Sequence, residues 1–258
     1  EVADDMKITF TPAERHELLE RFIRYTRIDT QSDENSTTSP STEKQKDLAR
    51  LLVQELKQMG LADAAMDQWG YVTATIPAST PELGAKVPVL GYLAHVDTAF
   101  GCSGADVKAQ VHENYDGRDL VLPGNPDVVI TVAENPLLKK AVGHTVITTD
   151  GTTLLGADDK AGIAEIMTAA KWLLDHPEFQ HGRIRIGFTT DEEVGRGTEH
   201  FDVKAFAADV GYTFDGSELG EIEDETFCAD FARVTIAGKD VHPGYAKDKM
   251  INAVRVAS

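Results

Sequence analysis

The sequence has 258 residues, 41% of them hydrophobic and 26% charged, with a formal net charge of −18. This composition indicates a folded protein of one or two domains and excludes a wholly disordered chain. The acidic charge argues against a nucleic-acid or anionic-membrane partner, and no apolar run is long enough for a membrane helix. Cys102 and Cys228 are too few and too far apart for a disulfide framework, and no secretory signal pattern is present, so we expect a cytoplasmic protein.

The first elements are two helices and a hairpin. Thr11-Pro12 predicts a capped helix over the following AERHELLERFIRYTRI, and residues 31–41 form a polar loop. A second helix is expected from about Thr42 to Met59, with Gly60 as its stop. The run AAMDQWGYVTATIP predicts two strands that turn at Trp69-Gly70.

Alternating strands and helices follow. Val87 to His95 is nearly continuous apolar, typical of a strand covered on both faces, and residues 183–190 and 210–215 read the same way. A β-branched segment precedes a helix expected from Lys160 to Leu174. Residues 101–136 are rich in Gly, Asn, Asp and Pro, and we expect short strands there or a cover over a site. This order predicts an α/β fold with a mixed, largely parallel sheet between helices.

The character of the sequence changes after Asp215. ELGEIEDETF and CADFARVTIAGKD predict antiparallel strands, and VHPGYAKDKMINAVRVAS begins a helix that stops in mid-pattern. We therefore expect a first domain over residues 1–225 and the start of a smaller α+β domain over residues 226–258. A final helix without a partner suggests that the sequence is a C-terminally truncated fragment.

Four polar clusters follow the predicted core strands. They are His95-Val96-Asp97, Asp158-Asp159, Asp191-Glu192-Glu193 and Asp215. Ligands of open α/β sheets bind beyond the carboxyl ends of the strands, so these clusters should converge. One imidazole with several carboxylates and no thiolate favours zinc, with manganese or cobalt as alternatives.

Each cluster also has a simpler explanation. His95 could be a hydrogen-bonded histidine at a strand end, although a carboxylate two residues later could fix its tautomer. Two Asp residues could mark a helix N-terminus, which explains one of them better than both. Asp191 to Glu193 could be a solvated acidic turn, and Asp215-Gly216 could be a turn as well. Because all four clusters follow predicted strands, one shared metal site is favoured over four separate explanations.

At these residues the sequence resembles a known clan of enzymes. HVDT (residues 95–98), TTDGTTLLGADDKAGIAEIMTA (148–169), DEEVGRG (191–197) and VHPG (241–244) are similar to motifs of the dinuclear zinc exopeptidases, a clan that includes aminoacylase and carboxypeptidase G2. Within that clan the long second string, together with ENYDG (113–117), resembles the peptidase T family of aminotripeptidases. The similarity extends from about Leu18 to the last residues.

The resemblance implies two zinc ions per subunit, with His95, Asp158, Glu193 and Asp215 as ligands. Asp158 would bridge both ions, Asp215 would join the ion of His95, and Glu193 would bind the other. Asp97 would orient His95. Glu192 would be the general base of the water that attacks the peptide bond.

The resemblance also assigns the two predicted domains. Residues 1–225 would be the N-terminal part of the catalytic domain, and residues 226–258 the incomplete start of a lid and dimerisation domain. From the lid, His242 would reach a substrate carbonyl or carboxylate, and the lid could carry homodimer contacts. Related enzymes supply a further histidine ligand from a later segment, so we expect the 258-residue chain alone to be inactive or poorly folded.

The implied function is a metal-dependent aminopeptidase that releases the N-terminal residue of a tripeptide. A carboxypeptidase or N-acyl amino acid hydrolase of the same clan would use the same metal centre with a different pocket. A non-catalytic metal-binding fragment is a third possibility, but it would have no need of Glu192.

Overall fold

The computed structural model describes residues 9–216, 219–225, 228, 230 and 232–258. Its contacts divide the chain into two compact units, Glu1–Ser217 and Glu218–Ser258. The assignment of residues 1–225 to a catalytic domain and 226–258 to a lid stays a prediction. Over the described residues, no helix combines the length and apolar character needed to cross a membrane.

A five-stranded mixed sheet forms the centre of the first unit. Its order is β1 (Ala65–Met66), β2 (Val72–Ile76), β8 (Ile184–Thr189), β3 (Leu90–His95) and β9 (Val210–Thr213). Strands β8, β3 and β9 are parallel, whereas β1 and β2 form the predicted hairpin and β2 runs antiparallel to β8. The predicted α/β architecture with a mixed sheet is therefore confirmed, with its parallel part confined to three strands.

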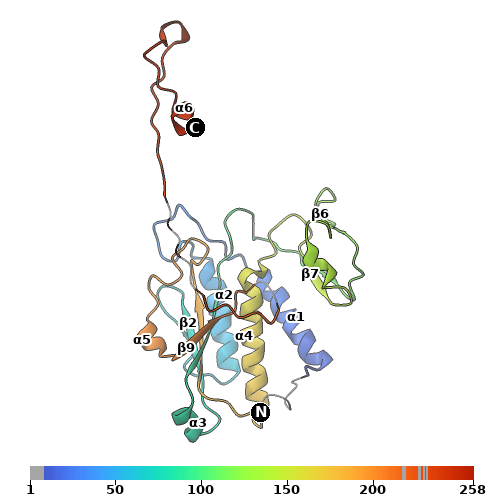
Figure 1. The fold of residues 1–258 in the computed structure, drawn as a ribbon. Helices are drawn as coiled ribbons and strands as arrows, with labels where there is room; N and C mark the ends of the chain where they lie inside the picture. Colours follow the sequence, from blue (N-terminus) through green and yellow to red (C-terminus); the bar gives the residue numbers. More distant parts are fainter. Residues whose placement is uncertain (1–8, 217–218, 226–227, 229, 231) are drawn as a thin grey trace. The chain divides into compact units, whose positions relative to one another are not determined.

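Three long helices cover one face of this sheet (Figure 1). α4 (Ala157–Asp175) packs against β3 and α1 (Pro12–Thr26), and α2 (Gln45–Gln58) packs against the β1–β2 hairpin. The core between them contains Ile184, Ile186 and Phe188 from alternate positions of β8, each at most 3% exposed. Alternate residues of a strand point to one face, so a run of large apolar side chains fills this layer.

The expected start of α1 is confirmed by its cap. Thr11 Oγ1 accepts a hydrogen bond from the backbone N–H of Glu14, and the Glu14 carboxylate accepts one from the backbone N–H of Thr11. Pro12 is the first helical residue, where its missing N–H costs nothing.

The opposite face of the sheet carries a thinner cover. The short helix α5 (Val203–Phe206) places the Phe206 ring over two glycines, and a Cβ on Gly91 would lie 2.7 Å from that ring. The six-residue helix α3 (Pro81–Lys86) lies between β2 and β3 in the chain. β9 differs from the prediction of a buried strand, because it is an edge strand and all its residues are exposed.

The segment between β3 and α4 forms two small sheets, as one of the two expectations for it allowed. β4 (Gln110–His112) pairs with β7 (Val146–Thr148), and β5 (Leu120–Val121) pairs with β6 (Val129–Ile130). The 3₁₀ helix η1 (Pro136–Lys139) lies between β6 and β7. The expectation that a core strand leads into Asp158 is wrong, since β7 belongs to a separate sheet and an irregular segment joins it to α4.

The second unit has little regular structure in its described part. It contains the 3₁₀ helix η2 (Pro243–Tyr245), the short helix α6 (Ala253–Ala257) and a bridge between Lys239 and Ile251. The described residues of ELGEIEDETF and CADFARVTIAGKD form no strand, unlike the prediction, and other residues of these segments lie outside the described part.

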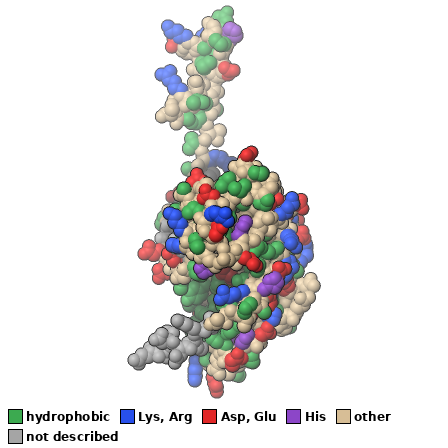
Figure 2. All heavy atoms as spheres, turned by 90° about the vertical axis from the view of Figure 1, so that its right-hand side faces the viewer, with side chains coloured by type: hydrophobic (Ala, Val, Ile, Leu, Met, Phe, Trp, Pro, Cys, Tyr) green, Lys and Arg blue, Asp and Glu red, His purple; other side chains and the backbone are tan. Residues whose placement is uncertain are grey.

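Figure 2 shows one face of the molecule, on which Lys and Arg side chains are interspersed with Asp and Glu side chains.

Candidate active site

His95 ends β3 and is the centre of the predicted site. The side chain is 2% exposed, and its Nδ1 lies 3.0 Å from the backbone carbonyl oxygen of Asp97, to which it donates. Its Nε2 lies 2.9 Å from Asp158 Oδ1. The His-x-Asp spacing thus fixes the ring through the Asp97 carbonyl and leaves Nε2 directed at the acidic cluster.

Carboxylates from three separate segments surround Nε2 of His95. Asp215 Oδ2 lies 3.8 Å from it and Glu192 Oε2 lies 3.9 Å from it, in addition to Asp158. One ligand atom each from His95, Asp158 and Asp215 lie within 4.8 Å of one another. The convergence expected from the polar clusters is therefore found, although Asp158 arrives from an irregular segment.

Besides facing His95, the Asp97 carboxylate binds the backbone of Glu192 and Glu193, which the sequence did not reveal. Its carboxylate is fully buried, with Oδ1 lying 3.4 Å from His95 Nδ1 and accepting a hydrogen bond from the backbone N–H of Glu192 at 3.0 Å. Its Oδ2 accepts one from the backbone N–H of Glu193 at 3.1 Å. One carboxylate therefore faces the imidazole and holds the turn that carries both glutamates.

The paired Asp residues at the start of α4 divide their roles. Both have non-helical backbone angles, and their peptide bond is cis. The Asp158 side chain is 71% exposed and faces the cluster, whereas Asp159 is buried and accepts hydrogen bonds from the backbone N–H groups of His95 and Gly162. Asp159 therefore braces β3 against α4, and Asp158 remains available to a ligand.

A glycine permits the close approach of β9 to this point. A Cβ on Gly162 would lie 2.1 Å from the carbonyl oxygen of Phe214 and 2.4 Å from Asp159 Oδ1. Phe214 directly precedes Asp215, so the absent side chain lets Asp215 reach the cluster.

The remaining predicted site residues are placed less directly. Glu193 is not part of the three-residue group, and its assignment as the ligand of a second ion stays a prediction. Its carboxylate is close enough to Asp158 and His95 to be influenced electrostatically by both. His242 belongs to the second unit, where its Nδ1 accepts a hydrogen bond from the backbone N–H of Gly244, and its substrate role also stays a prediction.

The electrostatics of the cluster reflect crowded negative charge. Burial raises the pKa of Asp159 to about 8, and the neighbouring Asp215 and Asp158 add to the effect. Burial, together with nearby carboxylates, also raises the pKa values of Glu192, Glu193 and Asp215. Burial alone would lower the pKa of His95, but Asp97, Asp159 and Asp215 outweigh it and raise the pKa to about 10.

These residues fit a divalent cation. A buried imidazole and convergent carboxylates supply nitrogen and oxygen donors without thiolate, the set that suits zinc and also manganese or cobalt. A cation would offset the burial and the mutual repulsion that together raise the carboxyl pKa values. The donor chemistry therefore agrees with the predicted metal dependence.

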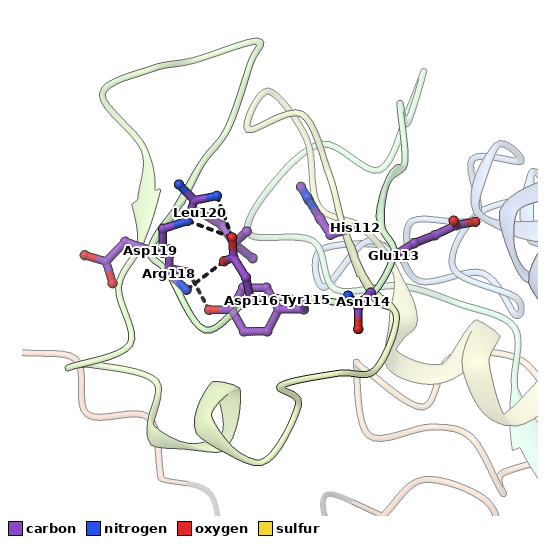
Figure 3. A pocket seen from close by; sticks show the side chains of 8 residues that line it. All are labelled: His112, Glu113, Asn114, Tyr115, Asp116, Arg118, Asp119 and Leu120. Atoms are coloured by element: carbon purple, nitrogen blue, oxygen red, sulfur yellow. Dashed lines mark hydrogen bonds and ion pairs between the residues drawn. The ribbon is translucent and has the colours of Figure 1, made fainter.

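A separate pocket of about 340 Å³ lies in the segment between β4 and β5, and none of the predicted site residues line it (Figure 3). It contains the ENYDG motif. Tyr115 is buried and donates its hydroxyl hydrogen bond to the carbonyl oxygen of Arg118, while the Asp116 carboxylate accepts from Arg118 Nε at 2.7 Å. Arg118 thus pairs with both Tyr115 and Asp116 inside the pocket.

Comparison with known proteins places the chain in a family. No family model matches it. It is 54% identical to peptidase T of Listeria welshimeri over 243 residues and 55% identical to peptidase T of Geobacillus kaustophilus over the same length. These matches cover 94% of the chain but 58% of either relative, so the chain spans less than two thirds of their length.

Solved structures agree on the fold. The aminopeptidase PepT of Bacillus cereus superposes with a TM-score of 0.59 at 22% identity, covering 94% of this chain and 55% of that one. A tripeptidase of Staphylococcus aureus superposes with a TM-score of 0.54 at 24% identity, covering 79% of this chain and 44% of that one. Because the chain is 54–55% identical to these peptidase T sequences over 94% of its length, it belongs to the peptidase T family.

Proposed function

We propose that the chain is the metal-binding part of an aminopeptidase that releases the N-terminal residue of tripeptides. The observation that carries the proposal is the convergence of Asp158, Asp215 and Glu192 on Nε2 of His95. The relatives are named peptidase T, and the structural neighbours are an aminopeptidase and a tripeptidase.

The proposed metal set consists of two zinc ions, with manganese or cobalt as alternatives. His95 and Asp215 would hold one ion, Glu193 the other, and Asp158 both. When bound, the ions would polarise the scissile carbonyl and lower the pKa of the attacking water.

The chain's own residues supply the proton transfers. Glu192 would take a proton from the attacking water and pass it to the leaving amine. Asp97 keeps the His95 ring oriented and holds the backbone of Glu192. His242 would contact the substrate carbonyl or carboxylate.

The proposal also covers the substrate, the cellular location and the oligomeric state. The substrate is a small peptide, the location is the cytoplasm, and a second copy of the chain binds through residues 226–258 to form a homodimer. Light scattering of the protein with and without those residues tests the dimer.

The decisive experiment compares the full-length protein with its Glu192→Gln variant in the presence of zinc. Release of the N-terminal residue from a tripeptide should fall by about 10²- to 10⁴-fold, with zinc content unchanged, because the variant loses the proton acceptor. Glu199→Gln, an exposed glutamate later in the same loop, is the matched control and should keep full activity.

Two results would contradict the proposal. Equal, measurable rates for the full-length protein and its Glu192→Gln variant would rule out Glu192 as the base, and hydrolysis only of N-acetylated or C-terminal substrates would favour another activity of the clan. The same assay tests the expectation that the 258-residue chain is inactive by itself.

A further inference from the structure

Asp191 lies where β8 gives way to the turn that carries Glu192 and Glu193. It is 1% exposed, and its φ of +61° is in the left-handed region. Among non-glycine residues, Asp and Asn adopt this conformation most readily. The chain reverses here, and the next two backbone N–H groups point at the Asp97 carboxylate.

The Asp191 carboxylate is anchored to the N-terminal end of α2. It accepts hydrogen bonds from the backbone N–H of Ser41 at 2.7 Å, from Ser41 Oγ at 2.5 Å and from Gln45 Nε2 at 2.7 Å. Gln45 Oε1 in turn accepts from the backbone N–H of Asp191 at 3.1 Å. Ser41 and Gln45 are 6% and 0% exposed, so this network is shielded from water.

Two buried carboxylates thus hold one turn from two sides. Asp191 ties its start to α2, and Asp97 ties its next two residues to the end of β3. Buried polar groups cost free energy unless they are paired. Here Asp97 pairs with the backbone of both glutamates, and Asp191 pairs with Ser41 and Gln45 directly before them. Arg196 Nη2, which is 3.6 Å from Asp191 Oδ2, adds a positive charge to the same network.

We propose that Asp191, with Ser41 and Gln45, is a positioning device that sets the direction of the Glu192 and Glu193 side chains. In this role Asp191 acts through Glu192 and Glu193 and is itself no ligand of the substrate or of a metal. The inference deepens the proposed function, because it gives α2 and the polar loop before it a role in aligning the base and one predicted metal ligand.

The test is Asp191→Asn, which keeps the shape and the left-handed preference but replaces one of the two oxygens that accept from the Ser41 N–H with an NH₂ group. We expect kcat to fall by about 10- to 100-fold, with KM within about twofold of its original value. Zinc affinity should weaken through Glu193, and the amide hydrogens of Glu192 and Glu193 should exchange faster with solvent.

A second variant provides rescue. Asp191→Asn combined with Gln45→Glu exchanges donor and acceptor, since the new amide at position 191 can donate to the new carboxylate at position 45. The backbone N–H at position 191 keeps its acceptor, and the amide oxygen still accepts from Ser41. We expect the double variant to recover most of the lost kcat and amide protection.

Ile76→Val is the control for stability, because Ile76 is a buried residue of β2 outside this network. The proposal is overturned if Asp191→Asn matches Ile76→Val in kcat, zinc affinity and protection of the Glu192 and Glu193 amides. Amide exchange needs neither metal nor substrate. It therefore decides the positioning role even if the protein proves not to hydrolyse tripeptides.

Discussion

Strands β3 and β8 contribute to two regions of the molecule that are stabilised differently. One is the face of the central sheet that the helices cover, and the other is the carboxyl ends of the strands. On the covered face Ile184, Ile186 and Phe188 are stabilised by burial itself. At the strand ends His95 and Asp97 are equally buried, but each is paired with specific polar groups. Substitutions on the face should therefore change stability, and substitutions at the ends should change binding and catalysis.

The largest expected effect on stability comes from Phe188→Ala. This residue is fully buried, and its truncation should lower the free energy of unfolding by about 3–5 kcal/mol, measured by urea denaturation. Zinc binding, measured at a temperature where the variant is folded, should be nearly unchanged. Loss of zinc affinity in a folded Phe188→Ala variant would show that the two regions are not separable.

Zinc should stabilise the strand ends directly. At a free concentration of about 100 times Kd, the free energy of unfolding should rise by about 2.7 kcal/mol. Asp158→Asn should remove most of this gain, since Asp158 Oδ1 lies 2.9 Å from Nε2 of His95. The control is Asp209→Asn, which alters the carboxylate that accepts from the Val89 N–H at the opposite end of the sheet. An equal zinc-induced shift in Asp158→Asn would contradict the assigned ligand.

Gly162→Ala should affect both regions, because the added methyl group meets the Phe214 carbonyl oxygen and displaces either α4 or β9. We expect a loss of about 1–3 kcal/mol in the free energy of unfolding, accompanied by weaker zinc binding through Asp215. Gly101→Ala is the matched control, since no atom lies within 4 Å of its added Cβ. Unchanged zinc affinity in Gly162→Ala would mean that Asp215 does not depend on this contact.

The smallest expected effect on stability is that of Thr11→Ala, which removes the N-cap of α1, one of the helices that cover the sheet. The free energy of unfolding should fall by about 1 kcal/mol in thermal denaturation. Zinc affinity and tripeptide hydrolysis should stay the same. A fall in either would reveal coupling between α1 and the strand ends through α4.

The sequence predicted those parts of the molecule whose signals are local. The cap at Thr11, the turn at Trp69-Gly70 and the apolar strands before His95 and Asp191 all lie within a few residues of the element they define. The position of β7 was predicted wrongly, because a short β-branched run is the same in a core strand as in a separate two-stranded sheet. Only pairing with β4 decides between them.

The residue types that gather at the strand ends can be read from the sequence, since His95, Asp158 and Asp215 follow recognisable patterns. The tertiary structure decided how they are held. Asp97 accepts from Glu192 and Glu193 across about 95 residues of chain, and Asp191 accepts from Ser41 across 150. Such hydrogen bonds leave no periodic pattern in the sequence, because they depend on which distant backbone groups the packed sheet and helices bring together.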